Sequence, residues 1–254
     1  MTEALFSLSG RVACVTGASS GIGRAIASAF ARAGAAVVGV ARREARLQDW
    51  VSEVEGQGGR AAACPLDLSE SEAVVSGAAE IAAPLGAPDI LVNAAGINLR
   101  EPAETVTLES WRRTLEINLS VPFFLARALV PAMRDKGWGR IINIASLQSE
   151  RAMPDSIAYG ASKGGVAQLT RAMAEAWSRY GITCNALAPG FFPTELTAPV
   201  FENDAAVTRN AAQTCIGRNG QDEDLIGPAL FVASPASDYV TGQMLYVDGG
   251  YTAK

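Results

Sequence analysis

The stretch that decides the fold is Thr16-Gly-Ala-Ser-Ser-Gly-Ile-Gly23, which follows the apolar run Arg11–Thr16. A helix-like run, Ala25–Arg32, comes directly after it. Glycines at this spacing let the backbone turn sharply from a strand into a helix and approach a pyrophosphate, whose charge then lies at the positive end of the helix. The sequence therefore predicts a phosphate-binding turn at the start of an α/β domain.

The same strand-then-helix order recurs along the rest of the chain. The expected strands are Arg11–Thr16, Ala36–Val40, Ala61–Pro65, Asp89–Val92, Arg140–Ala145, Ile182–Leu187 and Met244–Val247. The expected helices are Arg43–Glu55, Glu70–Ala83, Thr107–Asp135, Ile157–Tyr180 and Asp222–Val232. Because the strands are apolar throughout, they are typical of parallel strands buried on both faces by crossover helices. We expect a single doubly wound Rossmann-type domain over residues 1–254, with a parallel seven-stranded sheet and helices on both faces.

One segment breaks this order. From Phe191 to Gly220 the chain has two prolines and mixed polarity, which favours a lid or substrate loop beside the site. No linker or repeat divides the remaining sequence.

Composition excludes several classes of protein. With 21 basic and 26 acidic residues the net charge is -5, which gives no electrostatic basis for binding nucleic acid or an anionic membrane. The uncharged runs Ile182–Thr194 and Leu225–Ser237 are shorter than the ~18 residues of a membrane-spanning helix, and Met1–Gly10 does not resemble a signal peptide. The four cysteines show no C-x-x-C spacing, so we expect reduced thiols and a cytoplasmic protein.

The chain contains no histidine. Serine–histidine and cysteine–histidine catalysis and histidine zinc sites are therefore excluded, and we expect no metal site. Acid–base chemistry falls to other groups, and Tyr159-Gly-Ala-Ser-Lys163 places a phenol and an ammonium on one face of a helix. With three lysines and five tyrosines, about 0.06 such pairs are expected by chance. A nearby ammonium would lower the pKa of the phenol and make it a better base.

Several motifs in this order resemble those of the short-chain dehydrogenase/reductase family. They are the glycine motif, Asp67 after the third strand, Asn93-Ala-Ala-Gly96, which has Ala94 where the family has Asn, Pro189-Gly190 and Val247-Asp-Gly-Gly250. Asn118, Ser146, Tyr159 and Lys163 fall where the family has its four catalytic residues. The resemblance implies hydride transfer between a nicotinamide and a ketone or secondary alcohol, with Tyr159 as acid and base, Ser146 bonded to the substrate oxygen and Asn118 holding a relay water.

The resemblance also implies a set of cofactor-binding residues. They are Gly17, Ser19, Ser20, Gly21, Ile22, Gly23, Arg42, Asp67, Leu68, Asn93, Ala94, Ala95, Gly96, Tyr159, Lys163, Pro189, Gly190, Phe192 and Thr194. Relatives that prefer NAD usually have an acid where this chain has Ala41, whereas an adjacent arginine can bind a 2′-phosphate. Arg42 therefore favours NADP(H), while NAD(H) stays open because Ser20 stands where many NADP relatives have a second basic residue.

Within the family the chain is most similar to the gluconate 5-dehydrogenase and deoxygluconate dehydrogenase group. The likeness is carried by Phe6–Leu8, Ile97–Pro102, Ile141–Glu150 and Gly242–Gly250. It implies a sugar acid or polyol as substrate, held by Arg100, Ser146, Gln148 and Phe191. Leu99 replaces the first of the two arginines usual in that group, so a reductase of aryl or aliphatic ketones and a 3-oxoacyl-carrier-protein reductase remain alternatives.

Two further expectations concern partners and activity. The apolar stretch Val121–Ala126 and the resemblance favour a homotetramer. A catalytically inactive nucleotide-binding regulatory protein is the alternative outside enzymes. Such a protein would be expected to lose Tyr159 or Lys163, and both are present.

Overall fold

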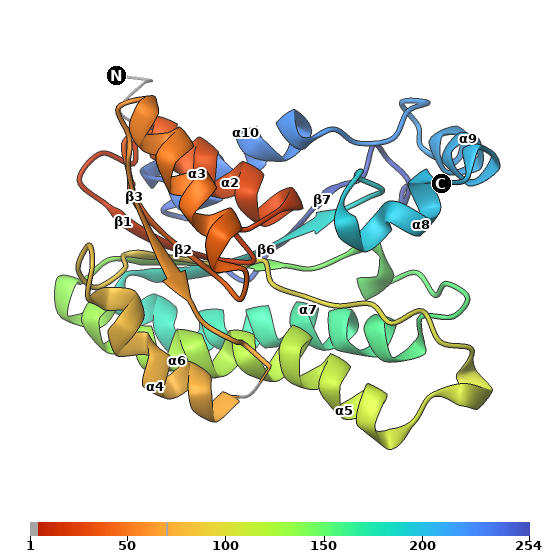
Figure 1. The fold of residues 1–254 in the computed structure, drawn as a ribbon, viewed down its shortest axis with the longest axis horizontal. Coiled ribbons are helices and arrows are strands. Elements are labelled where there is room, and N and C mark those ends of the chain that lie inside the picture. The colour runs from red at the N-terminus through yellow and green to blue at the C-terminus, as the bar shows by residue number, and fades with distance from the viewer. Residues whose placement is uncertain (1–4, 70) are drawn as a thin grey trace.

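Seven parallel strands form one sheet in the order β3-β2-β1-β4-β5-β6-β7 (Figure 1). The computed structural model describes residues 5–69 and 71–254. The strands are β1 (Val12–Thr16), β2 (Ala36–Ala41), β3 (Arg60–Pro65), β4 (Ile90–Asn93), β5 (Gly139–Ile144), β6 (Ile182–Pro189) and β7 (Met244–Val247). All seven expected strands are confirmed to within about two residues. The strand order reverses between β1 and β4, which is where open α/β sheets bind ligands.

Helices cover both faces of the sheet, as the sequence predicts (Figure 1). On one face lie α2 (Gly21–Arg32), α3 (Glu44–Gly56) and α10 (Asp222–Ala233). On the other lie α4 (Ser71–Ala82), α5 (Leu108–Leu115), α6 (Val121–Lys136) and α7 (Ile157–Trp177). The expected start of the fourth helix at Glu70 lies outside the described residues. A 3₁₀ turn over Ser178–Tyr180 forms the end of the helix expected to reach Tyr180.

The core has two layers because alternate residues of each buried strand face opposite sides of the sheet. In β1, Ala13 and Val15 pack in the layer that holds α2, α3 and α10, whereas Cys14 packs in the layer that holds α6 and α7. Both sets of side chains are fully buried, which explains why the strand sequence shows no polar alternation. Cys14, Cys64 and Cys184 are buried free thiols, as expected, and Cys215 is exposed.

The helix expected over Thr107–Asp135 is not a continuous α-helix. A π-helical turn, η2 (Glu116–Ser120), separates α5 from α6, and such turns concentrate at functional sites. By length and composition, the span Leu108–Lys136 is apolar enough to cross a membrane, although charged residues interrupt it. Its α6 part packs against α4 and buries Leu125 and Met133, and buried core helices have the same composition.

The interval expected to be a substrate loop contains short helices. They are the 3₁₀ turn η5 (Glu195–Thr197), α8 (Ala198–Phe201) and α9 (Asp204–Gln213). In Figure 1 they lie together beyond the sheet, close to the C-terminus. This arrangement places them over the carboxyl ends of the strands.

Candidate active site

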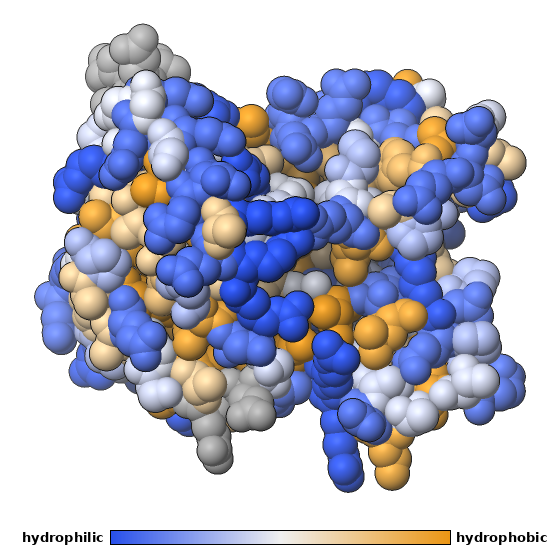
Figure 2. Space-filling model, viewed as in Figure 1, coloured by the Kyte–Doolittle hydropathy of each residue, from blue (hydrophilic) through white to orange (hydrophobic). Residues whose placement is uncertain are grey.

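One cavity of about 1330 Å³ extends from the phosphate-binding turn to the start of α7. Figure 2 shows the molecule hollowed between the α8–α9 segment and α5, with mostly hydrophilic side chains on the face in view. Ligand pockets usually measure about 300–1,000 Å³. This cavity is therefore large enough for a dinucleotide together with a small substrate.

At one end of the cavity lies the turn between β1 and α2. Gly17 has a φ of +72°, and a Cβ on Gly23 would lie 2.5 Å from the Gly17 carbonyl oxygen, so both positions require glycine. No side chain caps the N-terminus of α2, which opens at Gly21 in the cavity wall. The first amides of this 12-residue helix are thus available to a pyrophosphate, which is the geometry that a dinucleotide needs.

The residues expected to hold the adenosine half of a nucleotide also line this end of the cavity. They include Ser19, Ser20, Ile22, Arg42, Asp67 and Leu68. Arg43, which was not assigned a role from the sequence, contacts the turn directly: its Nη2 donates to Ser19 Oγ at 2.9 Å and to Ser20 Oγ at 2.8 Å. The sequence alone does not distinguish the two adjacent arginines, because only the tertiary structure shows which one reaches the turn.

The segment after β4 forms the middle of the wall. Ala94, Ala95 and Gly96 line the cavity, and the amides of Ala94 and Ala95 donate to Thr16 Oγ1 at 3.0 and 3.1 Å. Thr16 therefore fixes this segment although Ala94 departs from the family motif. Asn93 lies beneath the wall instead of in it: it is 4% exposed, and its Nδ2 donates to Asn143 Oδ1 at 2.9 Å.

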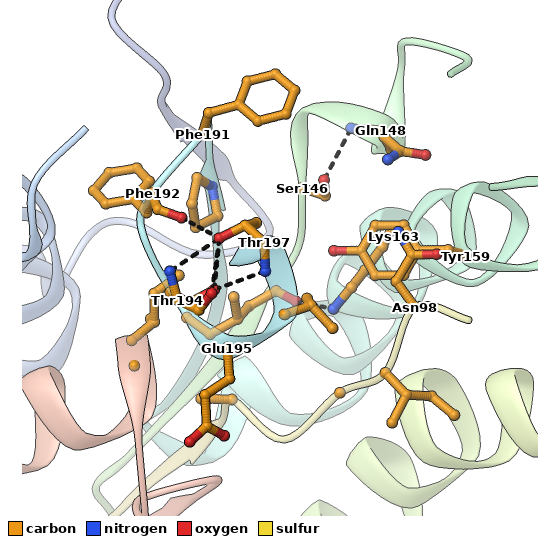
Figure 3. A pocket seen from close by; sticks show the side chains of 18 of the residues that line it. Asn98, Ser146, Gln148, Tyr159, Lys163, Phe191, Phe192, Thr194, Glu195 and Thr197 are labelled. Atoms are coloured by element: carbon orange, nitrogen blue, oxygen red, sulfur yellow. Dashed lines mark hydrogen bonds between the residues drawn. The ribbon is translucent and has the colours of Figure 1, made fainter. Parts of the chain in front are cut away.

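The substrate loop closes the cavity from the other side. Pro189, Gly190, Phe191, Phe192 and Thr194 all line it, as expected. Phe191 packs against Tyr251 with ring centroids 5.7 Å apart, and Phe192 is buried. In Figure 3, Phe191, Phe192 and Thr194 lie on one side of the view, and Tyr159 and Lys163 lie on the other.

Tyr159 and Ser146 meet where β5 ends and α7 begins. Both side chains line the cavity, and Ser146 Oγ accepts from the Gln148 amide at 3.1 Å (Figure 3). Burial raises the pKa of Tyr159, while Ser146 and the charge of Arg100 act in the opposite direction. Arg100 therefore adds a positive charge that favours the phenolate, besides the nearby Lys163 ammonium to which the sequence assigns this role.

Lys163 is 5% exposed and lies beside the tyrosine ring, with Nζ 5.6 Å from the ring centroid. Its Nζ donates to the Ile144 carbonyl at 2.6 Å. Burial lowers the pKa of Lys163 to about 8. The ammonium is therefore fixed at the end of β5, in the wall of the cavity.

Asn118 lies in the π-helical turn and is 1% exposed. Its Nδ2 donates to the Ile97 carbonyl at 2.9 Å and to Ser162 Oγ at 3.0 Å, and its Oδ1 accepts from the Ile97 amide at 2.9 Å. The side chain is therefore occupied in joining the segment after β4 to α7. All four residues expected to be catalytic come together, and the relay water expected at Asn118 stays a prediction.

The cavity wall also contains three arginines and a glutamine, besides apolar residues such as Met153 and Val200. They are Arg100, Arg151, Arg209 and Gln148, and Gln148 Oε1 is buried without a hydrogen-bond partner among the described residues. Arg100 has a φ of +53°, a strained conformation for a residue with a side chain, and its Nη2 donates to the Leu196 carbonyl at 3.3 Å. Neither Arg151 nor Arg209 belongs to a sequence motif, and only folding brings them to this cavity.

Comparison with known proteins agrees with this geometry. A family model described as "Enoyl-(Acyl carrier protein) reductase" matches residues 17–252. The chain is 42% identical over 248 residues to gluconate 5-dehydrogenase of Gluconobacter oxydans (strain 621H), covering 98% of this chain and 97% of the relative. It is 41% identical to 2-dehydro-3-deoxy-D-gluconate 5-dehydrogenase of Bacillus subtilis (strain 168), with the same coverage.

A solved structure supports the same assignment. The crystal structure of a gluconate 5-dehydrogenase from Burkholderia cenocepacia J2315, in complex with NADP and tartrate, matches with a TM-score of 0.96 at 40% identity and covers 100% of both chains. Together with the glycine turn and the meeting of Ser146, Tyr159 and Lys163, these findings show that the chain belongs to the short-chain dehydrogenase/reductase family and is an NAD(P)-dependent oxidoreductase.

Proposed function

We propose that the protein interconverts a secondary hydroxyl and a ketone on a sugar acid, with NADP(H) as the preferred cofactor and Tyr159 as the acid and base. The observation that carries this proposal is the single cavity that joins a phosphate-binding turn, the side chains of Ser146 and Tyr159, and Arg100. The relatives named for gluconate and deoxygluconate substrates support the same substrate class.

The bound nicotinamide would supply or accept the hydride. In the oxidation, the Tyr159 phenolate takes the proton of the substrate hydroxyl, and in the reduction the phenol returns it. Ser146 donates to the same substrate oxygen and keeps it within reach of Tyr159. Since both hydroxyls line the same cavity, one substrate oxygen can contact the two of them.

Lys163 and the phosphate-binding turn hold the cofactor in this scheme. The turn would bind the pyrophosphate at the N-terminus of α2, and the Lys163 ammonium can donate to ribose hydroxyls while it remains bonded to the Ile144 carbonyl. Asn118 connects α7 to the segment after β4 through its hydrogen bonds to Ser162 and Ile97. These contacts fix where the nicotinamide would lie relative to Tyr159.

The carboxylate of the substrate is assigned to Arg100. Arg100 lines the same cavity as Tyr159, and its positive charge opposes the rise in the phenol's pKa that burial causes. The unpartnered Gln148 Oε1 is suited to accept from a substrate hydroxyl, because a buried acceptor without a partner is costly until it is filled. A carboxylate at one end and hydroxyls along the chain are the features of a sugar acid.

A substrate panel tests the proposal. Oxidation of gluconate-type acids and polyols, and reduction of keto acids, aryl ketones and 3-oxoesters, are followed at 340 nm with both cofactors. We expect acids with hydroxyls near the carboxylate to give the highest kcat/KM, and Arg100→Leu to reduce it about tenfold or more for acids and little for neutral substrates. Faster turnover of a neutral aryl ketone, insensitive to Arg100→Leu, would instead establish a carbonyl reductase.

The proposal includes a cytoplasmic homotetramer. A stacked pair, Phe123 and Trp177, lies 6.4 Å apart on α6 and α7, and both residues are only partly buried. Partly buried aromatic faces of this kind are suited to packing against another copy. Light scattering that gives the 26.4 kDa of one chain would contradict the tetramer.

A further inference from the structure

A carboxylate from the substrate loop lies among cationic and hydroxyl groups at the nucleotide end of the cavity. Glu195, in η5, is bonded to Arg43 Nη1 at 2.9 Å, to Ser20 Oγ at 3.1 Å and to Arg46. The hydrogen bond from Arg43 is the main reason that the pKa of Glu195 is lowered to about 2. The carboxylate is therefore ionised. Arg43, Arg46 and Ser20 surround it with hydrogen-bond donors and positive charge, which together can bind an anion.

This cluster is separate from the reacting end. In Figure 3 the Glu195 side chain points away from Tyr159 and Lys163. Its neighbour Thr194 lies against the phosphate-binding turn, since a Cβ on Gly21 would meet the Thr194 side chain at 3.2 Å. The substrate loop is thus fastened across the nucleotide cleft at the turn itself.

The partners of Glu195 are also the groups suited to a 2′-phosphate. Arg43 is the second residue after β2, next to Arg42, and it contacts both Ser19 and Ser20 of the turn. Guanidinium and hydroxyl donors bind a phosphate as they bind a carboxylate, and a phosphate brings more charge and a third oxygen. NAD(H), which lacks the 2′-phosphate, has no anionic group at the ribose 2′ position for Arg43 to bind.

We propose that Glu195 is a specificity-determining residue for the nucleotide: its carboxylate competes with the 2′-phosphate of NADP(H) for Arg43, so binding of that phosphate releases the Glu195 end of the substrate loop. The inference rests on the nucleotide site described above and on no particular substrate. Glu195 reduces the preference for NADP(H) over NAD(H) that the arginines alone would give. It also links entry of the phosphorylated nucleotide to freedom of the loop.

The strength of the competing contact is modest. The Arg43 and Glu195 side chains are 42% and 51% exposed, and an exposed ion pair shifts an equilibrium by up to about fivefold. A phosphate can therefore displace the carboxylate, and removing the charge should be measurable. We expect Glu195→Gln to tighten the dissociation constant for NADPH about threefold to fivefold and to leave that for NADH unchanged.

Equilibrium titrations of NADPH and NADH fluorescence, without substrate, test this inference. Adenosine 2′,5′-bisphosphate and adenosine 5′-monophosphate, used as competitors, show whether the difference comes from the 2′-phosphate. Glu202→Gln is the matched control. Glu202 is an exposed acid just after α8, and its substitution removes the same negative charge. In an Arg43→Ala background, Glu195→Gln should have no further effect on NADPH binding.

Two results would overturn the inference. If Glu195→Gln weakens NADPH and NADH alike, Glu195 holds a lid over either nucleotide and does not compete with one. If neither dissociation constant changes relative to Glu202→Gln, the cluster is an exposed ion pair without a role in binding. Thermal midpoints of each variant exclude loss of folding as the cause, and a failure of the sugar-acid assignment would leave all these titrations unaffected.

Discussion

The Asn118 side chain donates from Nδ2 to Ser162 Oγ across 3.0 Å, and Ser162 Oγ donates in turn to the Tyr159 carbonyl at 2.7 Å. This pair joins the π-helical turn to the helix that carries Tyr159 and Lys163. Since Ser162 is fully buried, no solvent can replace these bonds. The relationship makes Ser162 a positioning residue for the proton donor.

Ser162→Ala should lower kcat while leaving KM for NADPH nearly unchanged, because it loosens Tyr159 and leaves the Asn118 amide short of one acceptor. An unsatisfied buried donor costs about 1–3 kcal/mol, so the thermal midpoint should fall as well. Steady-state kinetics and a thermal melt measure both effects. The exposed Ser52→Ala on α3 is the control, and an unchanged kcat for Ser162→Ala would refute the positioning role.

Tyr159→Phe should reduce turnover at least 100-fold, because it removes the hydroxyl that exchanges the proton while keeping the ring. Nucleotide binding should stay within about twofold of the unsubstituted protein, as judged by NADPH fluorescence. Residual activity above about a hundredth would show that another group carries the proton.

Arg100→Leu should shift the pH profile of alcohol oxidation to higher pH. Oxidation needs the phenolate, and loss of the positive charge of Arg100 raises the pKa of Tyr159 further. The dependence of kcat on pH, measured with a neutral alcohol, separates this electrostatic effect from any effect on carboxylate binding. Arg100→Lys should restore much of the profile, whereas Arg113→Leu on the exposed side of α5 should not move it; a profile unchanged in Arg100→Leu would contradict the electrostatic link.

Lys163→Met should abolish activity and yet stabilise the protein at neutral pH. The folded-state pKa of Lys163, about 8, lies below its ordinary value of 10.5, so the unfolded state binds more protons between these values and this group destabilises the fold most below pH 8. The gain in thermal midpoint should therefore shrink as the pH rises from 8 towards 10.5. Lys136→Met is the contrasting variant, because it leaves buried Asp89 without its 2.8 Å ion pair and should lower the midpoint; a variant at position 163 that is less stable at pH 7 would refute the sign.

Arg42→Ala should raise KM for NADPH about tenfold, or about 1.4 kcal/mol, with little change for NADH. The side chain is exposed and lines the nucleotide end of the cavity, where a charged bond to the 2′-phosphate would be lost. Arg60→Ala, at the start of β3, removes an exposed arginine outside the cavity wall as a control. Equal losses with both nucleotides would show that Arg42 is structural.

The sequence by itself determined the sheet and the reacting group. Strands buried on both faces are apolar throughout, so β1 to β7 could be read directly, and Tyr159 and Lys163 are neighbours because four residues make about one helical turn. Motifs of this kind are local: their residues lie close in the sequence and therefore close in space. The positions of Ser146 at the end of β5 and of the glycine turn after β1 follow from the same local order.

Only the tertiary structure decided the contacts between distant segments. Glu195 meets Arg43 across 152 residues, and the charge of Arg100, far from Tyr159 in the sequence, favours the Tyr159 phenolate. The π-helical turn at Asn118 was also invisible, since its sequence continues a helical pattern and the side chain is fixed by partners on other elements. Electrostatic and packing energies depend on distances through space, and for these residues the chain order does not fix those distances.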